Sequence, residues 1–359
     1  MQPNCILFIP VSSTSGIGEY MRSIIVAKAL KARWPDIHIH FILNEQVSYL
    51  TDCPYTVHTC KDSPTKALTR VNDIIVNLNP DLVIFDASGR AKQFKQAKAV
   101  GAKVAFISQH KRKRSRGLKF NRLFNTDIHW VAQPHYCIGS VSYWQKFKLA
   151  LLNKKEPKII GPVFELSDAK HQLERLKHYN LTKDTYIFFN AGSGGHKVKD
   201  VFVADIYYQA AEAFYRQNFD HETKFKCVVI FGSNYPKRLP ESKNIICIKD
   251  IEHRDFITLL SNAKGCVIAA GDTLLQAIAL HKTCVVAAVS PDQPARLRLC
   301  QKHRLVFAAE LSPISLVAQI LEMLNNEKRD MIMVNMKTLA PVKALENIVD
   351  DIASLFSTV

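Results

Sequence analysis

The sequence lacks an apolar run long enough to cross a membrane, which takes about 20 residues in a helix. Its longest apolar runs, such as residues 6–10 and 284–289, have the length of single strands. The first residues, MQPNC, carry no basic segment and no cleavage pattern, which argues against a secretory signal. We therefore predict a cytoplasmic protein in which any membrane contact is peripheral.

Metal-binding and cofactor motifs are also absent. His38 and His40 alternate on a predicted strand, but no further ligands follow at a spacing that would bind zinc. The Walker A motif and the GxGxxG dinucleotide fingerprint do not occur, so we predict neither a metal nor a dinucleotide cofactor. The nine cysteines include no CxxC pair, and several lie in apolar runs, which favours reduced thiols in a cytosolic core.

What the sequence does contain is enough apolar side chain for a folded core and a large positive charge. Its 359 residues correspond to about two domains, and 47% are hydrophobic, which excludes a mostly disordered chain. Lysine and arginine total 48 against 32 acidic residues, a net charge of +16. Such a charge predicts an anionic partner: nucleic acid, a phosphorylated substrate or an anionic membrane face. Nucleic acid is the least favoured, because no RNA- or DNA-binding motif accompanies the charge.

Apolar runs alternate with segments of helical periodicity in both halves of the chain, which predicts parallel sheets covered by helices. The predicted strands are residues 5–11, 38–43, 82–85, 103–107, 129–132, 186–190, 227–231, 244–248, 266–269 and 284–288. The stretch Ile159-Ile-Gly-Pro-Val163 interrupts the alternation and predicts a domain boundary. We expect an α/β protein of two Rossmann-like domains, residues 1–163 and 164–359, with the C-terminal helix in the second.

Three polar, glycine-bearing loops follow predicted strands, where open α/β sheets bind their ligands. The first is Ser12-Ser-Thr-Ser-Gly-Ile-Gly-Glu19, the second is Gly192-Ser-Gly-Gly-His196, and the third is Ala270-Gly-Asp-Thr-Leu-Leu-Gln276. Each offers backbone amides to an anion, although for the second loop, taken alone, a plain turn is the favoured interpretation. Glu19 is either a favourable charge at a helix N-terminus or a general base.

These loops resemble motifs of GT-B-fold nucleotide-sugar enzymes. Gly16-Ile-Gly-Glu-Tyr-Met-Arg22 is similar to the opening loop of the MurG type, which adds GlcNAc to a lipid-linked precursor, and of the PseG type, which hydrolyses a UDP-sugar. Gly271-Asp-Thr-Leu-Leu-Gln276 resembles their donor motif, and the segments at 190–195 and 286–292 are similar to lipopolysaccharide heptosyltransferases. Two positions depart from the MurG and PseG pattern: Glu19 replaces a histidine, and Gln276 replaces the usual glutamate.

The resemblance implies two Rossmann-like domains facing across a cleft, with the acceptor on the N-terminal domain and the donor on the C-terminal one. It implies Glu19 as the catalytic base. Asp86 is a second candidate because of its position at a strand end, although a buried structural acid is the favoured interpretation. The implied donor-binding residues are Gly16, Gly18, Gly192, Ser193, Gly194, Gly195, Lys199, Gly271, Asp272, Thr273, Gln276 and Gln293.

The segment of residues 111–124 is the densest basic cluster, and Phe120, Leu123 and Phe124 fall within it at helical spacing. A basic amphipathic element is typical of docking to an anionic membrane. The alternatives are a solvated charged loop or contacts with an anionic acceptor. The residues that we assign to membrane or acceptor contact are Arg112, Lys113, Arg114, Arg116, Phe120 and Phe124.

From these patterns and the resemblance we expect a glycosyltransferase of cell-envelope polysaccharide synthesis in a bacterium. It would move a sugar from a UDP-linked donor to a membrane-associated glycan or lipid-linked acceptor, with inversion and without a metal. We expect the protein in the cytoplasm, peripheral on the inner face of the cell membrane. The alternatives are a nucleotide-sugar hydrolase of the PseG type and a non-enzymatic binder of anionic ligands.

Overall fold

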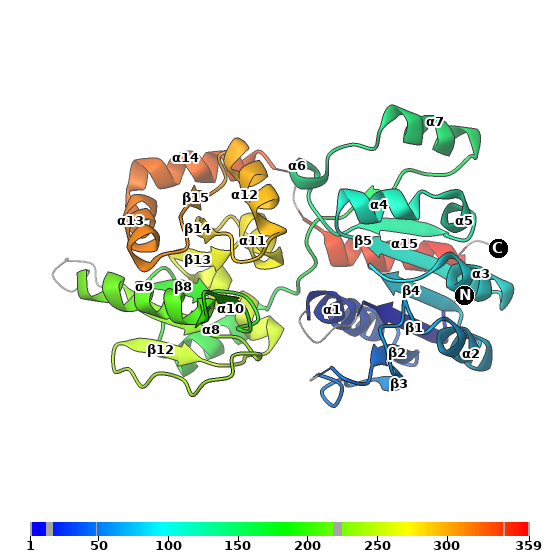
Figure 1. The fold of residues 1–359 in the computed structure, drawn as a ribbon, viewed down its shortest axis with the longest axis horizontal. Coiled ribbons are helices and arrows are strands. Elements are labelled where there is room, and N and C mark those ends of the chain that lie inside the picture. Colours follow the sequence, from blue (N-terminus) through cyan, green and yellow to red (C-terminus); the bar gives the residue numbers. More distant parts are fainter. Residues whose placement is uncertain (1, 12–16, 48, 218–224, 340–341, 358–359) are drawn as a thin grey trace. The chain divides into compact units, whose positions relative to one another are not determined.

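The computed structural model describes residues 2–11, 17–47, 49–217, 225–339 and 342–357. The chain divides into two compact units, of which the first comprises Met1–Val163 with Lys343–Val359 and the second comprises Phe164–Val342. Each unit is built on its own parallel sheet with helices around it (Figure 1). This confirms the predicted α/β class with two Rossmann-like bodies.

The first unit has a seven-stranded sheet in the order β3-β2-β1-β4-β5-β6-β7, and all its neighbouring strands are parallel. The apolar runs of the sequence form its central strands, which are buried on both faces, as expected for a parallel sheet. The strands are β1 (Cys5–Pro10), β2 (His38–Asn44), β3 (Thr56–Cys60), β4 (Leu82–Asp86), β5 (Lys103–Ser108), β6 (Ile128–Val131) and β7 (Lys158–Ile159).

The basic segment of the first unit forms two short helices, α4 and α5, instead of one amphipathic element. The helices of this unit are α1 (Gly18–Arg33), α2 (Leu68–Leu78), α3 (Ala91–Ala99), α4 (Lys111–Gly117), α5 (Phe120–Leu123), α6 (His135–Ile138), α7 (Tyr143–Leu151) and α15 (Ala344–Ser357). No helix within the described ranges is both long and apolar enough to span a bilayer.

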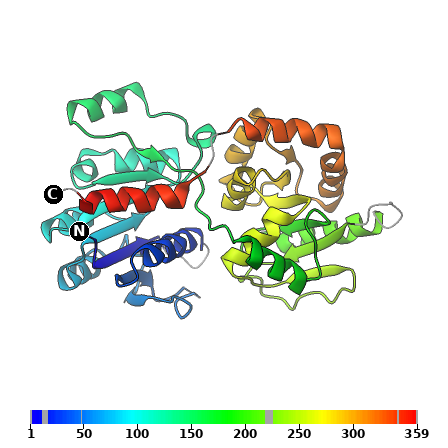
Figure 2. The same ribbon diagram turned by 180° about the vertical axis from the view of Figure 1, so that it is seen from behind.

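Helix α15 belongs to the first unit although it follows the whole second unit in sequence. It lies beside α1 against the first sheet (Figure 2). The buried indole Nε1 of Trp130 donates to Asp351 Oδ2 at 2.8 Å, and Lys158 Nζ donates to Asp351 Oδ1 at 2.8 Å. Assigning this helix to the second domain was therefore wrong, because sequence proximity does not show which sheet an amphipathic helix covers.

The second unit has a six-stranded parallel sheet in the order β12-β11-β8-β13-β14-β15 and a separate small hairpin of β9 and β10. The strands are β8 (Tyr186–Asn190), β9 (Lys197–Val198), β10 (Val201–Phe202), β11 (Lys226–Ile230), β12 (Ile245–Ile248), β13 (Gly265–Ala269), β14 (Cys284–Ala287) and β15 (Phe307–Ala308). The helices are α8 (Ala169–His178), α9 (Val203–Gln217), α10 (His253–Asn262), α11 (Asp272–Ala279), α12 (Gln293–Lys302), α13 (Pro313–Leu324) and α14 (Asn326–Lys337).

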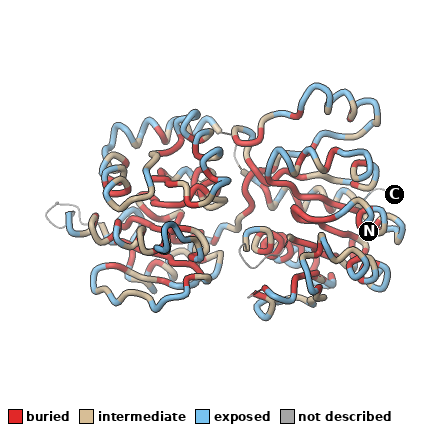
Figure 3. Tube along the Cα trace, in the orientation of Figure 1, coloured by how far each residue is buried: buried red, intermediate tan, exposed pale blue. Residues whose placement is uncertain are grey.

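The central strands of both sheets are buried along their length (Figure 3). In the second unit one core cluster joins β8, β11 and β13 to the apolar faces of α9 and α13, with Phe189, Phe214 and Ile320 fully buried. Cys227 lies in this cluster, and burial raises the pKa of its thiol to about 12. Such a thiol stays protonated and packs as a small apolar side chain.

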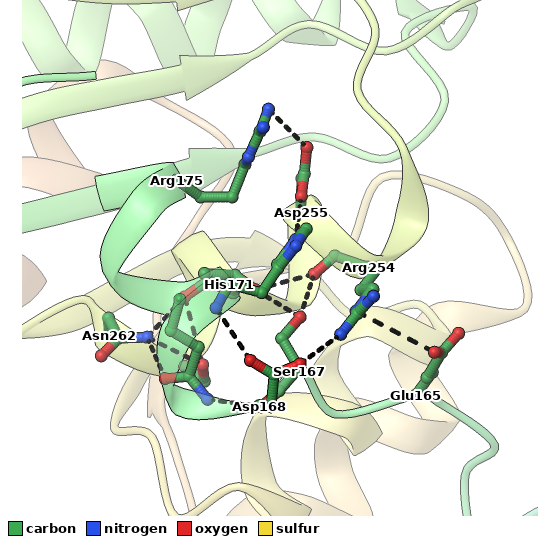
Figure 4. A network of polar contacts seen from close by, with 11 residues as sticks. Glu165, Ser167, Asp168, His171, Arg175, Arg254, Asp255 and Asn262 are labelled. Atoms are coloured by element: carbon green, nitrogen blue, oxygen red, sulfur yellow. Dashed lines mark hydrogen bonds and ion pairs between the residues drawn. The ribbon is translucent and has the colours of Figure 1, made fainter. Parts of the chain in front are cut away.

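A polar network joins α8 to α10 near the start of the second unit (Figure 4). His171 Nε2 lies 2.6 Å from Asp255 Oδ1, and Arg254 Nη2 donates to Asp168 Oδ2 at 2.9 Å. Asp168 also caps α8 by accepting from the His171 backbone N–H at 2.9 Å. Because these charges are matched within the network, we assign it the structural role of fixing α8 on α10.

Candidate functional site

The second unit has a topological switch point between β8 and β13. Strand β8 is the first of its sheet, and the chain continues to β11 on one side of it and later to β13 on the other. Ligands of open α/β sheets bind where the strand order reverses in this way. The loop at residues 192–196 follows β8 and the turn at residues 270–272 follows β13, so two of the predicted loops leave adjacent strands.

The loop after β8 has a shape that only glycine permits at its centre. Gly194 has a φ of +90°, and a Cβ there would lie 2.4 Å from the Phe231 carbonyl oxygen. A Cβ on Gly232 would lie 2.3 Å from the Ser193 carbonyl carbon. Asn190 fixes the start of the loop, since its side chain donates to Gly192 O and accepts from Gly192 N–H, both at 3.1 Å. The backbone of this loop is therefore held in place against the loop after β11.

The other side of the same loop is open. A Cβ on Gly192 would meet no described atom within 4 Å, and one on Gly195 would come no closer than 3.5 Å to Asn234. Ser193 and Gly192 are half-buried, and Gly195 is exposed. A rigid backbone with one open side has the form that backbone amides need to contact an anion.

The turn after β13 begins α11 and carries an arginine that the sequence reasoning missed. Gly271 is the N-cap of α11, and Asp272 is its first residue. Arg296 Nη1 donates to Ala270 O at 2.8 Å, and its Nη2 lies 3.2 Å from Asp272 Oδ1. The Arg296 side chain is only 10% exposed. It places a cation beside the turn, and no sequence motif marked it because it comes from α12.

Gln293, at the start of α12 after the loop that follows β14, lies beside the same turn. Its Oε1 accepts from the Val289 backbone N–H at 2.9 Å, and its Nε2 lies 3.8 Å from where a Cβ on Gly271 would be. Gln276 is buried one turn into α11, and Thr273 is half-buried at its second position. The structure therefore brings the predicted residues of the loops after β8, β13 and β14 to one edge of the second sheet.

Lys199 lies apart from these residues in the hairpin. It has a φ of +46° and the following Asp200 a φ of +66°, which makes the two the turn between β9 and β10. Both are exposed. Its assignment to the donor site stays a prediction.

In the first unit the switch point falls between β1 and β4. Asp86 ends β4 and is fully buried. Arg22 of α1 binds both its carboxylate oxygens, at 2.9 Å from Nε and 2.5 Å from Nη2, and Ser23 Oγ donates to it at 3.2 Å. A carboxylate engaged in this way holds α1 on the sheet, which favours the structural interpretation of Asp86 over the catalytic one.

Glu19 lies in the first turn of α1 and is half-buried, next to the exposed Gly18. Lys113 of α4 is close enough to interact with it. Burial lowers the pKa of Lys113, and the charge of Glu19 raises it. Gly16, the remaining predicted residue of this loop, lies outside the described residues.

The basic segment divides into buried, pocket-lining and exposed residues. Arg114 is only 5% exposed, because its guanidinium donates to Gly139 O at 2.5 Å and to Ser140 O at 2.9 Å. It is thus a structural residue, and its assignment to a membrane or acceptor contact is corrected here. Arg112 is exposed, while Lys113 and Arg116 line a pocket.

The two aromatic side chains of the basic segment are exposed, as docking to a membrane requires. Phe120 and Phe124 are 56% and 57% exposed, whereas Leu123 is buried.

The described residues contain no group of three or more His, Cys, Asp or Glu side chains that could hold a metal ion.

No protein-family model matches this sequence, and no curated protein matches it either. Solved structures match it over nearly its whole length. The glycosyltransferase SnogD from Streptomyces nogalater aligns with a TM-score of 0.62 at 13% identity, over 99% of this chain and 99% of its own. The UDP co-structure of MnaA from S. aureus aligns with a TM-score of 0.61 at 13% identity, over 100% of this chain and 98% of its own.

A putative UDP-N-acetylglucosamine 2-epimerase from Listeria monocytogenes aligns with a TM-score of 0.57 at 15% identity, over 99% of this chain and 97% of its own. Likeness at these identities defines the fold. The chain has the GT-B fold, as the motifs of the sequence predicted.

Proposed function

We propose that the protein transfers a sugar from a UDP-linked donor to a membrane-associated glycan or lipid-linked acceptor, with inversion and without a metal. The second unit holds the donor, and the first unit holds the acceptor. The observation that carries the proposal is the pair of glycine turns on the adjacent strands β8 and β13, at the switch point of a GT-B-fold chain. The UDP complex among its fold neighbours supports a uridine nucleotide as the donor carrier.

The donor diphosphate contacts the backbone amides of residues 192–195 and of the Gly271 turn, with Arg296 beside the turn. Leaving-group charge stabilised by fixed amides and a guanidinium requires no metal ion. Gln276, buried one turn into α11, hydrogen-bonds a ribose hydroxyl. Arg296 is held by Ala270 O and Asp272, so its charge is in place before the donor arrives.

Glu19 is the general base. The acceptor hydroxyl oxygen attacks the anomeric carbon, the bond from that carbon to the diphosphate oxygen breaks, and the hydroxyl proton passes to the Glu19 carboxylate. UDP leaves with the bonding electron pair. One displacement of this kind inverts the configuration at the anomeric carbon. Lys113 of α4 places a positive charge near the Glu19 carboxylate.

Replacing Gly271 by valine tests the donor site. The φ of Gly271 is −85°, and the nearest described atom to a Cβ there is 3.8 Å away, so valine fits the fold while filling the space in front of the turn. We expect titration calorimetry to show at least a tenfold weaker Kd for UDP, with an unchanged melting temperature without ligand. Unchanged UDP affinity in a folded variant would place the donor elsewhere.

Hydrolysis of a nucleotide sugar is the second candidate, because the glycine turns after β8 and β13 would hold the same donor. Water then replaces the acceptor hydroxyl. Release of UDP and free sugar at full rate without any acceptor supports hydrolysis, and release that requires an added glycan or lipid-linked acceptor supports transfer. A protein that binds UDP-sugars but releases no UDP under either condition is a binder.

The peripheral membrane contact rests on a surface that we call the aromatic face, formed by α5 and α7. Its exposed side chains are Phe120, Phe124, Tyr143, Trp144, Phe147 and Leu151. Lys148 Nζ lies 4.8 Å from the centre of the Phe120 ring, which joins the two helices. Aromatic side chains flanked by lysines are typical of the interface of an anionic bilayer. We therefore assign the docking to this face and only in part to residues 111–124.

A further inference from the structure

A strongly basic pocket of about 540 Å³ lies in the first unit, at the edge where β1 and β4 end. Its wall includes Val11 after β1 and residues 87–91 after β4, and α4 and α5 close it. Five of its lining residues are cationic and none is acidic; the cations are Arg90, Lys113, Arg116, Lys119 and Arg122. It therefore occupies the ligand-binding position of this sheet and carries charge of one sign.

Glu19 and Asp86 offset part of the charge of Lys113, but the lining of the pocket as a whole stays positive. Within the residues that the structure describes, no carboxylate forms an ion pair with any of the five cations. The pKa of Arg122 is lowered to about 10 by burial and then by the charges of Arg116 and Arg90. Arg122, Arg116 and Arg90 therefore repel one another until an anion is present.

Two of the cations are fixed in the wall. Lys113 Nζ donates to Ala87 O at 2.5 Å, and Arg122 Nη2 donates to Gly89 O at 2.5 Å. The Arg122 guanidinium also lies 5.3 Å from the centre of the Phe94 ring. These contacts attach α4 and α5 to the loop after β4 and hold the charges in position.

Two further cations keep their donors for a ligand. The side chains of Arg116 and Lys119 make no hydrogen bond or ion pair with the described part of the chain. Arg116 is half-buried on α4, and Lys119 is exposed just before α5. A planar guanidinium and a mobile ammonium at the mouth of a basic pocket suit the oxygens of a phosphate group.

From this arrangement we infer that the pocket binds a phosphate or diphosphate group of the acceptor. The inference rests on the proposed function, because the pocket would be the part of the first unit that recognises the acceptor. Lys113 is common to the pocket and to the surroundings of Glu19, so a phosphate held there would bring a neighbouring sugar hydroxyl toward the candidate base. The acceptor is then either a soluble sugar phosphate or a lipid-linked sugar phosphate.

The test uses the full chain with UDP at saturation, so that the donor site is occupied. Calorimetric titration with inorganic pyrophosphate and with glucose 1-phosphate measures the Kd of the pocket. We expect binding by the parent and at least a tenfold weaker Kd in the double variant Arg116→Gln, Lys119→Gln. Lys113 and Arg122 are left unchanged because they hold the loop after β4.

The matched control is Lys95→Gln, Lys111→Gln, which removes the same charge from exposed positions of the same unit outside the pocket wall. We expect its Kd to stay within about twofold of the parent, which would show that the pocket and not net charge binds the anion. Equal weakening in both double variants, or no binding by the parent, would overturn the inference.

The same variants separate this inference from the proposed function. If Gly271→Val loses UDP binding but keeps phosphate binding, the two sites are independent. If the parent binds phosphate but no UDP, the inference about the pocket holds and the proposed donor site fails. A second arm offers the parent vesicles of phosphatidylcholine with and without phosphatidic acid. If the vesicles compete with glucose 1-phosphate for the parent, and the double variant Arg116→Gln, Lys119→Gln shows no such competition, the phosphate belongs to a lipid. If the vesicles do not compete, the phosphate belongs to a soluble sugar phosphate.

Discussion

Arg22 follows Glu19 by three residues on α1, and its guanidinium is bound to both oxygens of the fully buried Asp86. This pair fixes the first turns of α1 to the end of β4, so Asp86 sets the position of Glu19 without being available to take a proton. Removing one partner of a buried ion pair commonly costs about 3–5 kcal/mol of stability. Loss of turnover in an Asp86 variant would therefore reflect a displaced helix as well as any chemistry.

Glu19→Gln separates catalysis from structure more cleanly. The amide keeps the size of the side chain but cannot accept the hydroxyl proton, so we expect turnover at saturating donor and acceptor to fall by about 10²–10⁴. UDP affinity should be unchanged, because the glycine turns that we propose for the donor diphosphate belong to the second unit. Steady-state UDP release measures the effect.

The alternative role of Glu19, a charge at the N-terminus of α1, predicts a different result. Its loss would then cost less than about 1 kcal/mol of stability and leave turnover near normal. Near-normal turnover of a folded Glu19→Gln protein would remove Glu19 from the mechanism.

His129 gives the first unit a pH dependence. Burial, with smaller contributions from Arg114 and Arg122, lowers the pKa of His129 to about 3. An unfolded histidine titrates near 6.5, so below that pH the unfolded chain binds a proton that the folded chain does not. The contribution of His129 to the free energy of unfolding should therefore decrease by about 1.4 kcal/mol between about pH 7.5 and pH 5.5.

His129→Gln measures this contribution, because glutamine does not titrate and can still hydrogen-bond Ser108, whose Oγ lies 2.9 Å from His129 Nε2. The three tryptophans, Trp34, Trp130 and Trp144, all lie in the first unit, so urea unfolding followed by their fluorescence reports on it. Other histidines contribute equally to both proteins. The same pH dependence in parent and variant would show that His129 is protonated in the folded state.

At the scale of helices and strands, the features predicted correctly are those that depend on a pattern of consecutive residues. Runs such as Ile6 to Ile9 became buried parallel strands, and the loops after β8 and β13 fell at the ends of adjacent strands. Features that depend on distant partners were missed. Strand β3 has a mixed pattern at the sheet edge, and Arg296 reaches the Gly271 turn from another helix. Neither leaves a local signal.

The contacts of the basic segment likewise depend on residues that are distant in the sequence. Its composition predicted one amphipathic surface. In the structure the Arg114 guanidinium donates to two backbone carbonyl oxygens instead, and α7 supplies most of the exposed aromatic side chains. Consecutive charges in a sequence do not show which of them a neighbouring loop will bury.

The aromatic face makes a prediction of its own. Trp144→Gln, Phe147→Gln should reduce sedimentation with vesicles of phosphatidylcholine and phosphatidylserine. Trp144 and Phe147 are 73% and 58% exposed, so their contact with a bilayer interface has apolar area to bury and little packing in the fold to lose. We expect the partition coefficient to fall at least tenfold.

A matched control removes two equally exposed apolar side chains from the second unit, Leu173→Gln, Met331→Gln, at 69% and 56% exposure. This control should sediment like the parent. Vesicle binding that is equal in all three proteins would contradict a role for α5 and α7.

At the scale of the whole chain, the two units differ in how they are assembled. The second is one continuous stretch, residues 164–342, whereas the first needs residues 343–359 from the far end of the chain. Without α15, the indole N–H of Trp130 loses its acceptor Asp351, and the apolar surface that α15 covers is exposed to water. The two units should therefore behave differently when the chain is cut.

We expect a fragment of residues 164–342 to fold alone and to bind UDP, because its sheet, its core and both glycine turns lie within it. UDP at about 100 times its Kd should stabilise the fragment by about 2.7 kcal/mol, which a thermal melt with and without UDP measures. The same fragment carrying Gly271→Val should melt at the same temperature without UDP and gain little from it. A folded fragment that UDP does not stabilise, beside a full chain that it does, would show that residues of the first unit complete the donor site. A fragment of residues 1–163 should instead be less stable than the first unit of the full chain, because the strand that carries Trp130 has lost the helix that covers it.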